Sequence, residues 1–302
     1  MFSKINKHYL LLHVIVFIWG WAPIFGRAIS ISALDLVWFR ILITVAMMAL
    51  YVLYTKHKIA LSLKKVVQLS VVGIIICIHW LCFYGAIKAS NISVTMAAFS
   101  TATLFTAIIE PLLFRRKIIL YELAIGTIII GAICLIFSVE IKYGLGLLLG
   151  VLAAFTSSLF SVLNGLLVKD TSEEVPAPVF SLIEMAAALI GLSIFLGFNG
   201  SYTTTFFAIS ATDLVLLILF AGFVTVLPFI VVIDLLKHIS PYTINLAVNL
   251  EGLYGIILAG IIFHENKDLS FTFYLGFAII LSAIFLNAYI KQRIEKRELD
   301  IS

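Results

Sequence analysis

Polar side chains capable of binding or proton chemistry interrupt one apolar run near the end of this 302-residue sequence. Asn245, Asn249, Glu251 and Tyr254 lie within residues 241–263, where most other residues are apolar. Helical residues three or four apart share a face, so Asn245 and Asn249 face one way, and Glu251 and Tyr254 face an adjacent way. Such a group can line a polar cavity that binds an amino group or carries a proton. The alternative is a set of hydrogen bonds to neighbouring helices.

Two further charged residues lie inside apolar runs. Arg40 could bind a carboxylate, pair with a buried acid, or extend its long side chain to the aqueous interface. Glu184 could line a cavity or form a structural hydrogen bond with a neighbouring helix. A charge at the centre of a membrane helix costs about 2.5–3.5 kcal/mol on insertion scales, so each of these residues is a candidate for function.

Aromatic and small polar residues accompany these charges. His79 and Trp80 could form a titrating cavity wall, or a core histidine beside an interfacial tryptophan. Trp19 comes shortly before Pro23, and proline removes a helix hydrogen bond, which predicts a bend that is either a hinge or a static kink. Ser100 could bond to a ligand or to another helix.

Four other polar residues are expected to have structural roles. Glu110 is expected to form an ion pair with the basic turn at residues 115–117. His264 and Glu265 are expected to be a solvated pair in a turn. Asn164 is expected to be interfacial or to hydrogen-bond between helices.

The composition excludes a soluble protein. Hydrophobic residues make up 63% and charged residues 12%, with a mean hydropathy of +1.17, whereas soluble domains carry about 25% charged residues. The three cysteines are scattered in apolar runs and predict neither a disulfide nor a metal site. We find no phosphate-binding loop, metalloprotease helix or serine elbow, so we expect no cofactor, no ATP-driven motor and no hydrolase. The net charge of +4 follows from the placement of lysines and does not indicate nucleic-acid binding.

Ten apolar runs are long enough to cross a bilayer as helices, which takes about 20 residues each. The sequence therefore predicts an all-α membrane protein. Fifteen of the 20 lysines and arginines then fall on one side, which places both termini in the cytoplasm by the positive-inside rule. The predicted spans are Tyr9–Ser30, Leu34–Tyr54, Val66–Ile87, Ile92–Phe114, Ile118–Ser138, Gly144–Val168, Pro176–Phe198, Leu214–Leu236, Pro241–Phe263 and Phe271–Ile290.

One passage recurs after 149 residues. Near Lys88 and again near Lys237, a small polar turn leads into an apolar span with polar residues, a short charged turn and a second span ending near glycine. We therefore expect two five-helix repeats, residues 1–139 and 140–290, and a charged cytoplasmic tail, residues 291–302. An odd number of spans per repeat makes the repeats inverted, which places a ligand cavity near the midplane at their interface and favours a transporter over an enzyme.

Short motifs lie along nearly the whole chain: Trp19-Gly20 in the first span, Arg40 early in the second, Phe83-Tyr84-Gly85-Ala86-Ile87 ending the third, and Leu250-Glu251-Gly252 before Glu265. With the repeat, they resemble the EamA-type members of the drug/metabolite transporter superfamily. The resemblance implies secondary transport, often export, of small organic molecules such as amino acids or other metabolites. The chain departs from the family pattern at Gly252, where proline is usual, and at His264, where glycine is usual. The first-half turn at residues 115–117 also has no glutamate.

We therefore predict a secondary active transporter that works as an exporter by alternating access. Amino acids are the first expectation, because Arg40 and Glu251 offer one group for each charge of the ligand. The alternatives are a facilitator, a transporter of drugs or other metabolites, or an intramembrane enzyme. The candidate substrate-binding residues are Glu251, Asn249, Asn245, Tyr254, Arg40, His79, Trp80, Ser100, Trp19 and Glu184.

The expected partners follow from this class. They are a small-molecule substrate, the lipid bilayer and protons as the coupling ion, with no nucleic acid. A monomer and a homodimer are both compatible with the sequence. The expected location is the cytoplasmic membrane of a bacterium, with the chain crossing it several times.

Overall fold

The computed structural model describes residues 7–57, 61–115, 117–139, 141–267 and 269–299. Lys4, Lys58 and Arg116, which the charge argument counts, and residues 300–302 of the predicted tail lie outside these ranges. Across the described ranges the regular elements are all helical, without a strand. They are α1 (Lys7–Trp19), α2 (Ala22–Ala28), α3 (Ala33–Tyr54), α4 (Leu63–Ala89), α5 (Ile92–Phe99), α6 (Ala102–Leu113), α7 (Leu120–Val139), η1 (Ile141–Tyr143), α8 (Gly144–Lys169), α9 (Ala177–Phe198), α10 (Thr204–Phe207), α11 (Ala211–Leu219), the π-helical η2 (Phe220–Val226), α12 (Leu227–Leu235), α13 (Pro241–Ile262), η3 (Glu265–Lys267) and α14 (Phe271–Leu299).

Each of the ten predicted spans is helical in the structure. Eight helical regions are long and apolar enough to cross a membrane, while α7 and α14 contain shorter apolar stretches, Leu120–Ile136 and Phe271–Asn287. The prediction of an all-helical, multi-pass protein is confirmed, and the total of ten crossings stays a prediction. The region Ile92–Leu113 is 83% buried, against 39–50% for the other seven, so α5 and α6 occupy the interior of the bundle.

Two of the membrane-length regions are broken where the sequence offers a reason. A Cβ on Gly20 would lie 2.6 Å from Cβ of Tyr254, so the lack of a side chain lets the end of α1 approach α13 closely. Pro23 then starts α2 after a turn, as the predicted bend requires. Between α5 and α6, the hydroxyls of Ser100 and Thr101 bond back to carbonyls of the preceding turn, a contact that bends helices.

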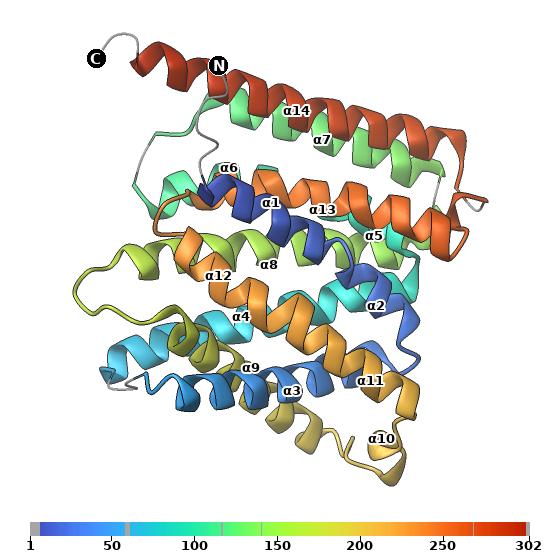
Figure 1. Ribbon diagram of the computed structural model, residues 1–302. Helices are drawn as coiled ribbons and strands as arrows, with labels where there is room; N and C mark the ends of the chain where they lie inside the picture. Colours follow the sequence, from blue (N-terminus) through green and yellow to red (C-terminus); the bar gives the residue numbers. More distant parts are fainter. Residues whose placement is uncertain (1–6, 58–60, 116, 140, 268, 300–302) are drawn as a thin grey trace.

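The long helices run side by side, and α1 begins at the same end of the bundle where α14 ends (Figure 1). We call this the terminal end; it also carries the turns after α3, α6, α8 and α12. The opposite, distal end carries the turns after α2, α4, α9 and α13. The charge rule predicts that the terminal end faces the cytoplasm.

Corresponding helices of the two halves make corresponding contacts, each with helices of the other half. In the first half, α4 packs against α8 and α9 of the second half. In the second half, α12 and η2 pack against α1 and α3 of the first. The last helices of the two halves, α7 and α14, pair with each other along one edge (Figure 1). Such an exchange fits a two-repeat architecture with inverted repeats, in which the main interface lies between the halves.

Candidate functional site

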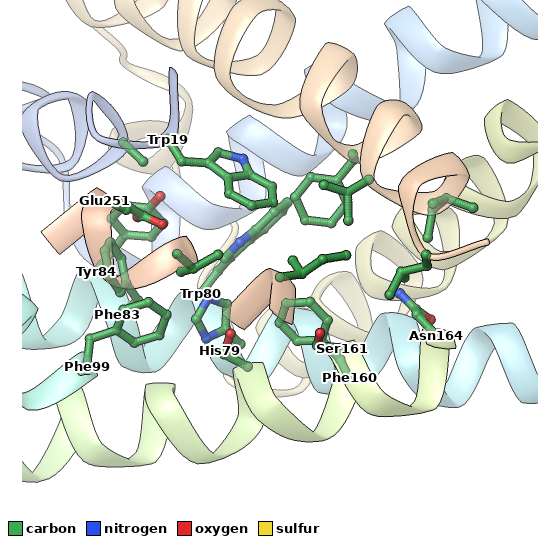
Figure 2. Close-up of a pocket in the computed structure, with 18 of the residues that line it drawn as sticks. Trp19, His79, Trp80, Phe83, Tyr84, Phe99, Phe160, Ser161, Asn164 and Glu251 are labelled. Carbon is green, nitrogen blue, oxygen red and sulfur yellow. The ribbon is translucent and has the colours of Figure 1, made fainter. Parts of the chain in front are cut away.

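A cavity lies between the two halves, lined by α1 to α5 from the first and by α8, α12 and α13 from the second. Its volume is about 80 Å³. Because one water molecule needs about 10–15 Å³, the cavity has room for several waters or for the polar part of a small solute. Of its 19 lining residues, seven are aromatic, most of them visible in Figure 2: Trp19, Trp80, Phe83, Tyr84, Phe99, Phe160 and Phe229.

Arg40 is the positive charge on the cavity wall. It extends from α3 and is only 2% exposed. Its Nη1 donates to the hydroxyl of Tyr84 at 2.6 Å, and its guanidinium carbon lies 3.8 Å from the ring centroid of Trp80. Ring faces attract cations, so these contacts fix the guanidinium in place without neutralising it. Among the described residues, no carboxylate lies within 4.0 Å of Arg40.

The π-helical segment η2 supplies two more contacts to Arg40. Nε of Arg40 donates to Oγ1 of Thr225 at 2.9 Å, and the guanidinium carbon of Arg40 lies 4.0 Å from the ring centroid of Phe220. Thr225 also donates its hydroxyl to the carbonyl of Phe220 at 3.1 Å. A π turn brings residues five apart onto one face, which is why both reach the same side chain. Arg40 is therefore held by both halves of the chain.

Glu251 is the acidic side chain on the cavity wall. It lies midway along α13, is 7% exposed, and accepts no hydrogen bond from the described residues. It is close enough to Arg40 to interact with it through space. Its helix approaches the first half closely because Gly255, one turn later, lies against Pro23, where an added Cβ would be 3.1 Å away. The wall thus carries a basic and an acidic side chain that do not form a direct ion pair.

His79 presents one ring nitrogen to the cavity. Its Nδ1 lies 2.8 Å from the carbonyl oxygen of Ala153. A carbonyl can only accept, so Nδ1 carries the proton and Nε2 is the acceptor in the neutral ring. The ring packs among Phe83, Phe99 and Phe160 (Figure 2). Together with Trp80 over Arg40, this arrangement gives the cavity a mainly aromatic wall with few polar atoms.

The structure separates the ten candidate residues into two sets. Trp19, Arg40, His79, Trp80 and Glu251 line the cavity. The other five do not. Two asparagines of α13 bond to α6: Asn245 to Oγ1 of Thr106 at 2.9 Å, and Asn249 to Oγ1 of Thr103 at 2.5 Å. Tyr254 packs edge-on against Phe17, Ser100 bonds to its own helix, and Glu184 is fully buried in α9. A role of these five in binding stays a prediction.

Three polar residues of α8 line the cavity although the sequence did not mark them as candidates. They are Ser157, Ser161 and Asn164, of which the last was expected to be interfacial or structural. Their spacing of four and then three residues places them on one helix face. That spacing is the signal that could have identified them.

The prediction that Glu265 is solvated in a turn with His264 is wrong. Glu265 is 3% exposed and accepts from the backbone N–H groups of Ile92 at 3.1 Å and Ser93 at 3.0 Å. It also accepts from the hydroxyl of Ser93 at 2.9 Å. The first N–H groups of a helix have no partner within the helix and favour a nearby negative charge. Glu265, after α13, therefore caps α5.

Glu110 makes the corresponding contact in the opposite direction. It lies in α6, is 2% exposed, and its Oε2 accepts from the backbone N–H of Tyr242 at 2.6 Å, in the first turn of α13. The predicted ion pair between Glu110 and the basic turn at residues 115–117 stays a prediction, and the sequence does not predict this capping contact. Tyr242 follows Ser93 by 149 residues, the offset of the repeat. The two contacts are therefore reciprocal: Glu265, after α13, caps the start of α5, and Glu110, in α6, caps the start of α13.

A serine and a carboxylate also join the halves at each end. At the distal end, Ser30 donates its backbone N–H to Asp213 at 2.8 Å and its hydroxyl at 2.6 Å. At the terminal end, Ser62 donates the same two groups to Glu173 at 2.7 and 2.6 Å. These hydrogen bonds lower the pKa of Glu173 below its ordinary value. We call the two contacts the distal clasp and the terminal clasp.

These features define a multi-pass α-helical membrane protein whose two halves enclose a central cavity. The chain belongs to the EamA-like transporter family, whose model matches residues 6–138 and 148–289. It is therefore a membrane transporter of small molecules, and the resemblance predicted from short motifs is confirmed. A solved structure described as "Crystal structure of protein" superimposes with a TM-score of 0.66 at 11% identity, over 92% of this chain and 96% of that one, and this likeness supports the fold alone. No curated protein matches the sequence.

Proposed function

We propose that this transporter is a secondary active exporter of small metabolites that carry both an amino group and a carboxylate, foremost amino acids. Its proposed location is the cytoplasmic membrane of a bacterium. The observation that carries the proposal is the pair of Arg40 and Glu251, a basic and an acidic side chain on one cavity wall without a direct ion pair. A zwitterionic solute offers a partner to both charges, whereas a neutral solute leaves both unpaired in a poorly hydrated site.

The surroundings of each charge support this assignment. Arg40 is already oriented by Thr225, Tyr84 and the rings on either side, so a carboxylate can bind without ordering a flexible side chain. Glu251 can accept hydrogen bonds from an ammonium group, which are strong when donor and acceptor are both charged. The remaining aromatic wall suits the apolar side chain of an amino acid.

Alternating access is the proposed mechanism. Inverted repeats allow the two halves to rock around a fixed central site. The distal and terminal clasps join the halves at opposite ends of that site. In the proposed cycle one clasp opens while the other holds, so the cavity faces one side at a time. Protons are the proposed coupling ion.

The test is transport by purified protein in liposomes, with a panel of labelled amino acids and with or without an imposed pH gradient. The variants are Arg40→Gln and Glu251→Gln, and the matched control is Glu174→Gln, an acid exposed in the turn after α8. We expect gradient-stimulated transport of amino acids by the wild type and the control, and its loss in both cavity variants. Amino-acid transport that survives the neutralisation of either cavity charge would contradict the assignment.

The seven aromatic lining residues favour a second candidate, a transporter of amphipathic drugs or aromatic metabolites. The same panel therefore includes nucleosides and aromatic cations. Transport of these solutes that is insensitive to Arg40→Gln would replace amino acids by this class. Transport that ignores the pH gradient in every variant would identify a facilitator.

A further inference from the structure

Buried oxygens without partners concentrate at one place behind the central cavity. Among the described residues, six buried side-chain oxygens lack a hydrogen-bond partner, and four of them belong to Asn164, Ser181 and Glu184. Glu184 and Ser181 are fully buried in α9, and Asn164 is 3% exposed in α8. Such groups are costly to bury unless something binds them, so the cluster points to a ligand.

The three residues are close enough to act as one site. Ser181 and Glu184 are three residues apart in α9 and share a face. Asn164 is the side chain that interacts with the Glu184 carboxyl group. Against the same stretch of α9, a Cβ on Gly73 of α4 would lie only 2.1 Å from the carbonyl oxygen of Glu184, so the backbones of α4 and α9 are in close contact there. The site is therefore enclosed.

Asn164 connects this site to the central cavity. Its side chain lies at the end of the cavity away from Glu251 (Figure 2). Glu184 does not line the cavity, is fully buried in α9, and interacts with Asn164, which does line it. A small ion that enters the cavity thus meets Asn164 before it reaches the carboxyl group of Glu184.

No basic residue in the part of the chain that the structure describes offers Glu184 a counter-charge. Among the described residues, Asn164 is the side chain that acts on it, and none of the titratable residues on the elements packed around α9 does so. Those residues are Asp35, Arg40, Tyr51 and Tyr54 on α3, Lys64, Lys65, Cys77, His79, Cys82, Tyr84 and Lys88 on α4, Lys169 on α8 and Asp234 on α12. An unpaired ionised carboxylate is unfavourable at this depth, so the acid requires a bound cation.

A proton fits the donor set better than a metal ion does. Hard metal cations take about six or more oxygen ligands, more than these three side chains supply. A proton on Glu184 creates an O–H donor close to Asn164, whose Oδ1 is an acceptor that has no donor. One proton therefore gives a partner to two of the unpaired oxygens.

The repeat supplies a reason for the position of Glu184. The helices α3 and α9 are the second long helices of their halves, and each has 22 residues. Arg40 is the eighth residue of Ala33–Tyr54, and Glu184 is the eighth residue of Ala177–Phe198. Inverted repeats exchange their conformations between the two states of a transport cycle. Because Arg40 now lies on the cavity wall, Glu184 is expected to reach that wall in the other state.

We propose that Glu184, with Asn164 and Ser181, forms a proton-binding site that is closed off in this state and opens to the central cavity when the halves exchange conformations. The proton binds and leaves at a carboxylate oxygen of Glu184, and water in the cavity is its donor and acceptor. The coupling part of this inference rests on the proposed alternating-access transport. In this proposal the proton binds at Glu184, and the substrate binds at a separate site formed by Arg40 and Glu251.

Infrared spectroscopy of the purified full-length protein in lipid tests the site without any substrate. We expect a C=O stretching band of a neutral carboxylic acid that is lost in Glu184→Gln and retained in Glu251→Gln. Asn164→Leu should move this band to higher frequency, because the acid loses its hydrogen-bond acceptor. A Glu184→Gln spectrum identical to that of the wild type would overturn the proposal, as would binding of radioactive sodium ions that is lost in this variant.

Transport then tests the coupling. With a solute that the liposome panel identifies, Glu184→Gln should retain exchange of labelled for unlabelled solute and lose its stimulation by a pH gradient, while Glu251→Gln loses both. Glu184→Asp, which keeps an acid, should retain a neutral-carboxyl band and part of the stimulation. Full gradient stimulation in Glu184→Gln would overturn the coupling role. If the panel contains no transported solute, the proposed function fails while the infrared result still decides the proton site.

Discussion

The two ends of the bundle are closed by the same chemistry in different surroundings. In both clasps a serine of the first half donates its backbone N–H and hydroxyl to one carboxylate of the second half. The distal carboxylate, Asp213, is 3% exposed, whereas the terminal carboxylate, Glu173, is partly exposed. Water competes for exposed hydrogen bonds and much less for buried ones. The distal end is therefore the more firmly closed.

The position of the cavity agrees with this difference. Its lining includes Asn164, in the last turns of α8, and Leu236, which directly follows α12, both towards the terminal end. A second hollow at that end is bordered by Leu167 and Lys237, neighbours of these residues along the chain. The cavity thus extends towards the end with the weaker closure.

The largest expected effect belongs to a buried distal contact, the cap on α5. In Glu265→Ala the N–H groups of Ile92 and Ser93 lose their acceptor in a buried place. We expect a loss of about 3 kcal/mol in the free energy of unfolding, since hydrogen bonds to a charged group are worth about 1.5–3 kcal/mol each. Denaturation of the purified protein in detergent measures it. The exposed neighbour is the control: Asn266→Ala should change the stability by less than about 0.5 kcal/mol. Equal effects in both variants would contradict the buried cap.

A matched pair of substitutions compares the clasps directly. Asp213→Asn and Glu173→Gln each replace one carboxylate by an amide of the same shape. We expect Asp213→Asn to increase hydrogen–deuterium exchange strongly in the peptide that contains Ser30, because a buried contact is lost. Glu173→Gln should increase exchange in the peptide containing Ser62 only slightly, since water already competes there. The reverse order would show that burial does not set the strength of closure.

The smallest effect concerns the response of the terminal end to acid. Hydrogen bonds from Ser172, and then from Lys65, lower the pKa of Asp170 to about 2 from its ordinary value of 3.8. Because the pKa is lower in the folded protein, the contact between Lys65 and Asp170 contributes fully above pH 3.8 and is lost as the pH falls towards 2. Carboxyl-carbon NMR of Asp170 should therefore show a titration midpoint of about 2, below the ordinary value of 3.8.

Two substitutions separate the causes of this shift. Ser172→Ala should raise the midpoint of the Asp170 titration more than Lys65→Met does, because the hydrogen bonds from Ser172 are the larger cause. A larger rise in Lys65→Met would mean that the ion pair, rather than the turn around Asp170, sets the charge at this end.

Much of the fold could be predicted because it depends on length and hydrophobicity along the chain. The apolar runs mark the helices, and Pro23 marks the bend after α1. The faces of α13 could also be predicted: the asparagines point away from Glu251, as their spacing indicates. Which of those faces meets the cavity depends on the packing of α6, and the spacing within α13 carries no information about it.

The errors share one physical origin, which is contact between segments distant in the sequence. From the local sequence Glu265 is a turn residue. Its role as a cap depends on Ser93 at the start of α5, which is 172 residues away in the chain. Likewise, the sequence of α8 alone does not reveal that Asn164 borders the cavity. In both cases the local sequence is ordinary, and the role depends on a helix from elsewhere in the chain.

The wide turn of η2 has a consequence for the register of its helix. Phe220 and Thr225 lie on one side of it because the segment Phe220–Val226 winds as a π-helix. Rewound as an α-helix, the same residues would be separated by well over a quarter turn, and only one of them could contact Arg40. Pro228 lacks the N–H that an α-helical turn would donate to the carbonyl of Val224, so rewinding gains little at that point. The π-helical winding of these seven residues thus determines whether Thr225 and Phe220 can both contact Arg40 from the second half of the chain.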